Sequence, residues 1–122
     1  MAARIALFPG TFDPITEGHV EIIQRGLALF DEIVVAVGIN SAKKTMYTAE
    51  QRLGWIRHQF AAEPRVRVDS FIGLTVNYAH QQQIRFLIRG LRAAPDFEYE
   101  KNIFLLNSHL ATDVETVFLI ST

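Results

Sequence analysis

The sequence contains no cysteine, which excludes thiol catalysis, disulfides and thiolate metal sites. It has no excess of basic residues, because its formal net charge is −1, and this argues against a general nucleic-acid binder. No apolar run approaches the ~20 residues of a membrane-spanning helix. Pro9-Gly10 also interrupts the first apolar stretch too early for a signal peptide. We therefore expect a cytoplasmic protein without nucleic-acid or membrane partners.

The chain of 122 residues is long enough for one domain with a single core, and its 49% of hydrophobic residues are ordinary for a globular protein. Apolar runs typical of strands alternate with amphipathic runs typical of helices. Strands are expected at about 4–8, 32–38, 66–68, 86–88 and 116–120, and helices at about 19–30, 48–63, 75–83 and 95–110. This alternation predicts an α/β fold, a doubly wound parallel five-stranded sheet with helices on both faces.

The loop after the first expected strand, from Gly10 to His19, is the most informative segment. Ligands of such sheets bind beyond the carboxyl ends of the strands, and the free amides at a helix start favour an anion. Gly10 lets the backbone approach a ligand, Thr11 supplies a hydroxyl, and His19 presents a ring nitrogen. The loop is neither a Gly-x-Gly-x-x-Gly motif nor a Walker loop with its lysine. Turn and cap residues with an incidental histidine are the plainer alternative.

Two further loops at the same sheet edge carry cations. The segment from Arg89 to Arg92 directly follows the fourth expected strand, and arginine side chains match phosphate oxygens at two points. Lys43-Lys44 lies in the loop after the second strand, where such a pair is more often solvated surface. Glu98 and Glu100 flank Tyr99 near the start of the last long helix. They either serve the helix dipole or contact a ribose or adenine.

Together these motifs resemble the nucleotidyltransferase superfamily with the His/Thr-x-Gly-His signature, here Thr16 to His19. Segments 8–14, 87–92 and 96–100 are similar to those of bacterial phosphopantetheine adenylyltransferases, over essentially the whole chain. The resemblance implies a Rossmann-like domain that transfers the adenylyl group of ATP to 4′-phosphopantetheine in coenzyme A biosynthesis. The products would be dephospho-coenzyme A and pyrophosphate. It also implies Mg²⁺ with ATP, a homohexamer, and dephospho-coenzyme A and coenzyme A as product and feedback ligands.

The resemblance assigns site residues by position. His19 is expected to stabilise the transition state, with Lys43 and Arg92 as further catalytic residues. The implied ATP-binding residues are Thr11, Phe12, His19, Gly90, Leu91, Arg92 and Glu100. The implied substrate-binding residues are Thr11, Lys43, Thr75, Arg89 and Tyr99. No residue is assigned to a metal, and the other histidines lack metal-ligand spacing, namely His58, His80 and His109.

The implied reaction needs no protein nucleophile or strong base, because the attacking phosphate oxygen is already anionic. The protein must hold two highly charged substrates in line and neutralise charge that develops on phosphate oxygens. The family continues past the fifth strand with a serine-rich phosphate-binding segment. We therefore expect residues 1–122 to be a single nucleotidyltransferase domain that lacks its C-terminal helices. Two alternatives stay open. One is a nucleotidyltransferase for nicotinate mononucleotide or a sugar or alcohol phosphate, and the other is a catalytically impaired nucleotide-binding fragment.

Overall fold

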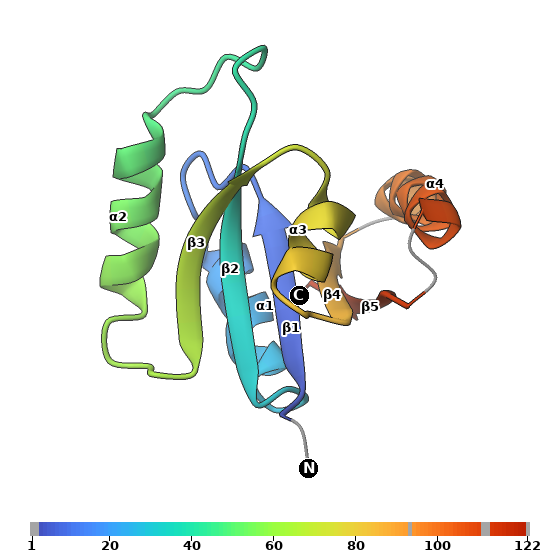
Figure 1. Cartoon of the computed structure of the whole chain (residues 1–122). Coiled ribbons are helices and arrows are strands. Elements are labelled where there is room, and N and C mark those ends of the chain that lie inside the picture. Colours follow the sequence, from blue (N-terminus) through green and yellow to red (C-terminus); the bar gives the residue numbers. More distant parts are fainter. Residues whose placement is uncertain (1–2, 93, 111–112, 122) are drawn as a thin grey trace.

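The computed structural model describes residues 3–92, 94–110 and 113–121. Strands and helices alternate along these residues, as the sequence predicts (Figure 1). The elements are β1 (Ile5–Gly10), α1 (Glu17–Gly26), β2 (Glu32–Ile39), α2 (Ala49–Gln59), β3 (Val66–Ile72), α3 (Thr75–Gln81), β4 (Phe86–Leu91), α4 (Ala94–Leu110) and β5 (Glu115–Ile120).

The strands form one parallel sheet in the order β3-β2-β1-β4-β5. Along the chain, β2 and β3 are added on one side of β1, and β4 and β5 are added on the other. The direction of winding therefore reverses between β1 and β4. In a doubly wound sheet this reversal opens a crevice at the carboxyl ends of the two strands. The predicted fold class is confirmed, and the fold places the candidate site at the end of β1.

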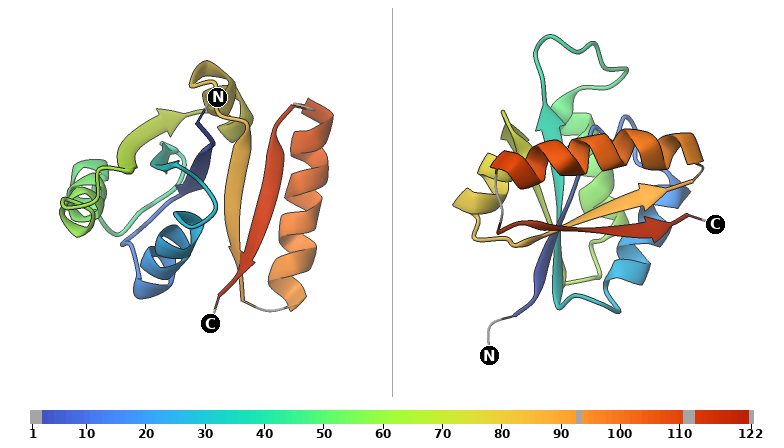
Figure 2. Two further views of the ribbon diagram at one scale, coloured as in Figure 1. Left: turned by 90° about the horizontal axis from the view of Figure 1, so that it is seen from below. Right: turned by 90° about the vertical axis from the view of Figure 1, so that its right-hand side faces the viewer.

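Helices cover both faces of the sheet (Figure 2). On one face, Ile23 of α1 and Ile56 of α2 pack with the alternate side chains Ile33, Val35 and Val37 of β2. On the other face, the intervening residues of β2 pack with α3. Because successive side chains of a strand point to opposite faces, β2 must be apolar at nearly every position to fill both cores. Its continuous β-branched run has this cause.

Three element boundaries differ from the prediction. The first helix is expected to reach Phe30 but ends at Gly26, and a turn follows in which the amide of Phe30 donates to the Gly26 carbonyl. The helical spacing of apolar residues continues past the helix because the Phe30 side chain is still buried in the same core.

The predicted loop at 69–73 is also wrong, because β3 continues to Ile72. Residues 66–72 pair with β2 from Ile33 to Ile39, so a long neighbouring strand overrides the polar side chains of Asp69 and Ser70. The fourth strand likewise extends beyond Ile88 to Leu91 through pairing with β5. Arg89 and Gly90 therefore belong to the end of β4 and do not follow it.

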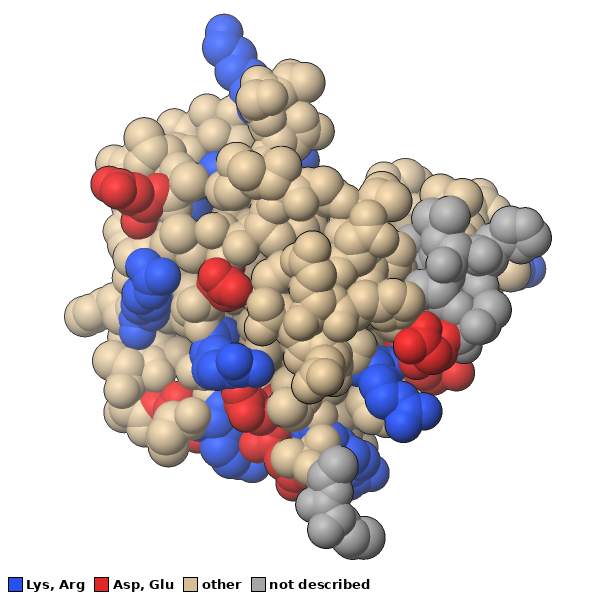
Figure 3. Space-filling view, viewed as in Figure 1, with Lys and Arg blue, Asp and Glu red and all other residues tan. Residues whose placement is uncertain are grey.

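The described surface is mixed in charge. On the face shown in Figure 3, basic and acidic side chains lie close together over the lower half, and neutral side chains cover most of the rest. The two signs offset one another there, in keeping with the formal net charge of −1. Within the described ranges, none of the helices combines the length and hydropathy that a bilayer crossing requires.

Candidate active site

A cavity of about 360 Å³ opens at the carboxyl ends of β1 and β4, where the winding of the sheet reverses. Its walls come from the end of β1, the first turn of α1 and the end of β4. His19, Arg89 and Arg92 all line it, so an imidazole and two guanidinium groups from distant segments share one space. The volume falls within the range of small-ligand pockets, and the cations suit an anionic ligand.

The His19 ring is held by a reciprocal cap at the start of α1. The backbone amide of His19 donates to Thr16 Oγ1 at 3.3 Å, and the amide of Thr16 donates to His19 Nδ1 at 3.0 Å. A backbone N–H can only donate, so Nδ1 accepts and the ring proton of the neutral imidazole lies on Nε2. The rings of Phe12 and Phe8 pack edge-on against the imidazole, with centroids 4.9 Å and 6.2 Å away. The protein thus fixes His19 as a donor through Nε2.

The surroundings of His19 also keep it uncharged. Burial lowers the pKa of the imidazole below its ordinary value, and the positive charge of Arg92 lowers the pKa further. A protonated ring would in addition lose the hydrogen bond from the Thr16 amide, because Nδ1 would then carry a proton. At neutral pH the unliganded cavity therefore presents a neutral imidazole donor together with permanently charged guanidinium groups.

A second, smaller cavity of about 40 Å³ lies on the side of the sheet covered by α3 and α4. Thr75, Ile103 and Phe104 line it, and Pro9 and Arg89 line both this cavity and the larger one. The Arg89 side chain donates from Nε and Nη2 to the two oxygens of Glu100, at 2.8 Å and 2.7 Å. The guanidinium group therefore forms part of the wall between the cavities, and Glu100 orients it at two points.

The sequence from residue 7 to residue 122 matches the family model described as cytidylyltransferase-like. A phosphopantetheine adenylyltransferase from Desulforudis audaxviator is 51% identical over 118 residues, which cover 97% of this chain and 72% of that protein. Another, from Geobacter metallireducens, is 48% identical over 122 residues, or 100% of this chain and 75% of that protein. The chain belongs to the phosphopantetheine adenylyltransferase family. It spans about three quarters of the length of these two relatives.

A solved structure supports the fold of this adenylyltransferase family member independently. The lipopolysaccharide core biosynthesis protein from Thermoplasma volcanium superposes with a TM-score of 0.72, and the match covers 99% of each chain. The two sequences are 19% identical, so this likeness concerns the fold alone.

The residues expected from the adenylyltransferase resemblance fall into three places. Phe12, His19, Gly90 and Arg92 line the larger cavity, Thr75 and Glu100 line the smaller one, and Arg89 lines both. Thr11 and Lys43 meet each other, since the Lys43 ammonium donates to Thr11 Oγ1 at 2.9 Å. The Tyr99 side chain is 64% exposed, and the Leu91 side chain is half-buried in β4. The structure thus gathers most of these residues around the β1–β4 crevice.

The donor set of the adenylyltransferase cavity does not fit a resident metal ion. No acidic side chain of the described residues lines the larger cavity, and Glu100 in the smaller one is engaged by Arg89. Across the described ranges, no group of three or more His, Cys, Asp or Glu side chains could hold a metal ion. Among the other histidines, His80 pairs with Asp113 at 2.7 Å, and the side chain of His109 lies outside the described residues.

Sequence reasoning missed Arg52, a buried arginine on α2 that donates to the carbonyl oxygen of Thr11 at 2.9 Å. A signal for it exists in the sequence. Arg52 precedes the buried Ile56 by four residues and so lies on the apolar side of α2. A charged residue at such a position needs internal partners, and in this protein the partners are backbone carbonyls of the site loops.

Proposed function

We infer that this chain transfers the adenylyl group of ATP to 4′-phosphopantetheine and releases dephospho-coenzyme A and pyrophosphate. One observation carries the inference. In a chain about half identical to proteins named for this activity, His19, Arg89 and Arg92 line one cavity at the start of α1. That combination of donors suits a reaction between two phosphate-bearing substrates.

The two cavities suggest how the substrates divide the site. We assign the triphosphate and nucleoside to the larger cavity, beside Phe12, His19 and Arg92. The acceptor then reaches the α-phosphorus from the smaller cavity, past Thr75 and Arg89. Arg89 lines both spaces, so it is placed to contact the acceptor phosphate close to the reacting phosphorus.

The chemistry requires positioning and charge stabilisation from the protein. An oxygen of the acceptor phosphate attacks the α-phosphorus, a new P–O bond forms, and the bond to the bridging oxygen breaks to release pyrophosphate. No proton must be removed from a phosphate that is already ionised. The Nε2–H of His19 and the guanidinium group of Arg92 offset the negative charge that grows on the oxygens of the transferring and leaving groups.

Magnesium enters this proposal as part of the substrate, as a complex with the phosphates of ATP. Mg²⁺ is usually held by substrate phosphates and one or two carboxylates, and the larger cavity has no carboxylate among its described lining residues. The hexamer, the cytoplasmic location and feedback by coenzyme A stay predictions from the family resemblance.

A turnover assay with an acceptor panel tests the function. Pyrophosphate release is measured with ATP and either 4′-phosphopantetheine, pantetheine without its phosphate, nicotinate mononucleotide or glycerol phosphate. We expect release only with 4′-phosphopantetheine. Release with another phosphate acceptor would support a different transferase of the same superfamily. Calorimetric binding of ATP without release with any acceptor would support a nucleotide-binding role instead.

A further inference from the structure

Arg52 is a buried cation outside the cavity that holds two site loops from below. Its side chain is 4% exposed, and it lines neither of the two cavities. Its Nε donates to the carbonyl oxygens of Tyr47 at 3.1 Å and Thr48 at 3.3 Å. Its Nη1 donates to the carbonyl oxygen of Thr11 at 2.9 Å. One guanidinium group therefore joins the loop after β1 to the segment that leads into α2.

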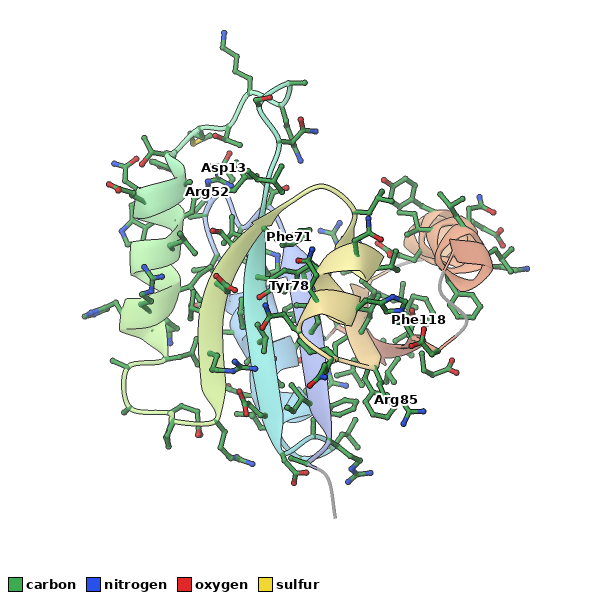
Figure 4. The ribbon with its side chains drawn as sticks, viewed as in Figure 1. Asp13, Arg52, Phe71, Tyr78, Arg85 and Phe118 are labelled. Carbon is green, nitrogen blue, oxygen red and sulfur yellow. The ribbon has the colours of Figure 1, made fainter. Side chains whose placement is uncertain are left out.

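Asp13 makes the reciprocal connection, from the first loop to the second. Its Oδ2 accepts from the amide of Met46 at 2.6 Å, and its Oδ1 accepts from the amide of Tyr47 at 2.9 Å. Figure 4 shows Asp13 and Arg52 close together between α2 and the loop that follows β1. Desolvation opposes ionisation of Asp13, but the two amides and the charges of Arg52 and Lys43 hold the pKa of its carboxyl below the usual value. The carboxylate thus stays charged beside the buried cation.

The two residues support the part of the first loop that bears Thr11. Phe12 follows with a φ of 48°, a left-handed conformation that costs a bulky residue about 1–2 kcal/mol. Such a conformation persists only where its surroundings hold it. Arg52 fixes the Thr11 carbonyl on one side, and the Phe12 ring is buried against Phe8 on the other.

The same arrangement sets where Thr11 meets Lys43. The Lys43 ammonium donates to the Thr11 hydroxyl at 2.9 Å, although the two residues lie on different loops and Lys43 is exposed. An exposed lysine on a loop has many accessible positions, so a single short contact across loops requires both backbones to be held. Between these loops, the described contacts that do so run through Asp13 and Arg52.

We propose that Arg52 and Asp13 are positioning residues for the adenylyl transfer reaction, and that they act by locking the loops that carry Thr11 and Lys43. This inference rests on the proposed function, because it needs Thr11 and Lys43 to contact the substrates. Neither Arg52 nor Asp13 touches a substrate in this proposal. Buried arginines are costly unless several hydrogen bonds compensate, and this one directs its donors to the backbone of the site loops.

The variant Arg52→Lys tests the proposal with the charge kept and the fork-shaped donor lost. We expect kcat to fall by about 10- to 100-fold, because small displacements of positioned groups have effects of that order. The fall in kcat should exceed the rise in KM for either substrate, since the lost alignment matters most in the transition state. Arg57→Lys is the matched control on an exposed position of the same helix, and it should keep the wild-type values.

A double-mutant cycle separates positioning from a merely structural role. If Arg52 acts through Lys43, the double variant Arg52→Lys with Lys43→Ala should lose less than the product of the two single losses. Thermal unfolding of each variant shows which assay temperatures keep it folded. A wild-type kcat in folded Arg52→Lys, even with a lower melting temperature, would overturn the proposal, and so would independent losses in the cycle.

Hydrogen exchange tests the lock without any reliance on turnover. The amides of Met46 and Tyr47 donate to Asp13, so a peptide over residues 40–48 should exchange faster in Arg52→Lys and in Asp13→Asn than in Arg57→Lys. Unchanged exchange in the first two variants would refute the coupling of the loops. An inactive wild-type protein would refute the proposed function instead, and the exchange rates would still decide whether Arg52 and Asp13 hold the loops together.

Discussion

His19→Ala is the substitution with the largest expected effect on the reaction. It removes the Nε2–H donor that the Thr16 cap and the Phe12 ring orient before any substrate arrives. A preorganised donor to developing negative charge is worth about 3 kcal/mol, so kcat should fall by about 100- to 1,000-fold. The fall should appear in kcat more than in KM, because the charge that the donor offsets grows only as the P–O bonds rearrange.

The same substitution should affect folding much less than catalysis. The hydroxyl of Thr16 can still cap the amide of residue 19, and the bond lost is the one from the Thr16 amide to the ring. Losses of that kind cost about 1 kcal/mol, together with a smaller packing contribution from Phe12 and Phe8. Circular dichroism melting and pyrophosphate release, measured on the same preparation, separate the two effects. His58→Ala serves as a control because His58 is exposed on α2.

A folded His19→Ala protein that turns over within a few-fold of the wild-type rate would refute the role given to the imidazole. Equal losses in His19→Ala and His58→Ala would refute it too. The Arg89 and Arg92 guanidinium groups would then have to carry the charge stabilisation without the ring.

Further predictions concern the ion pair, the helix cap and the titration of the imidazole. Glu100→Gln leaves the half-buried Arg89 without its two-point partner, so the free energy of unfolding in urea should fall by about 1–3 kcal/mol; no change would contradict the pairing. Thr48→Ala removes the hydroxyl that caps α2, and a loss of about 1 kcal/mol is expected in the same assay. His19 stays neutral in the folded protein where an unfolded imidazole, with a pKa of about 6.5, takes up a proton. Its contribution to stability is therefore present above about pH 6.5 and is lost as the pH falls toward its lowered folded-state pKa, and His19→Asn should remove that part of the pH dependence. Nitrogen NMR should find Nδ1 of wild-type His19 unprotonated at pH 7.

The order of the elements can be read from the sequence because the signals are local. The apolar run at 32–38 is long enough to be a strand buried on both faces, and the Thr48 cap with Gln51 marks the start of α2. The ends of the elements depend on distant partners. Residues 69–72 become a strand because β2 offers hydrogen bonds to them, and a polar segment gives no local sign of that pairing.

The candidate site divides in the same way. His19 and Arg92 are recognisable because they stand at loop positions where an α/β sheet binds its ligands. The use of the His19 ring as a helix cap was not predicted, since glutamate or glutamine usually reaches back from that position. The contact between Arg89 and Glu100 links β4 to α4, and the bonds of Arg52 cross from α2 to the loop after β1. Such contacts follow from the packing of the elements, which a single sequence does not reveal.

The partition between the two cavities determines how the choice of acceptor could be redesigned. Pro9 and Arg89 face both spaces, so exchanging either would disturb the nucleotide together with the acceptor. Thr75, Ile103 and Phe104 line the smaller space and not the larger one. A library confined to those three positions would vary acceptor preference while the grip on ATP is inherited unchanged. The scaffold thus separates the half of the active site that can diversify from the half that must stay constant.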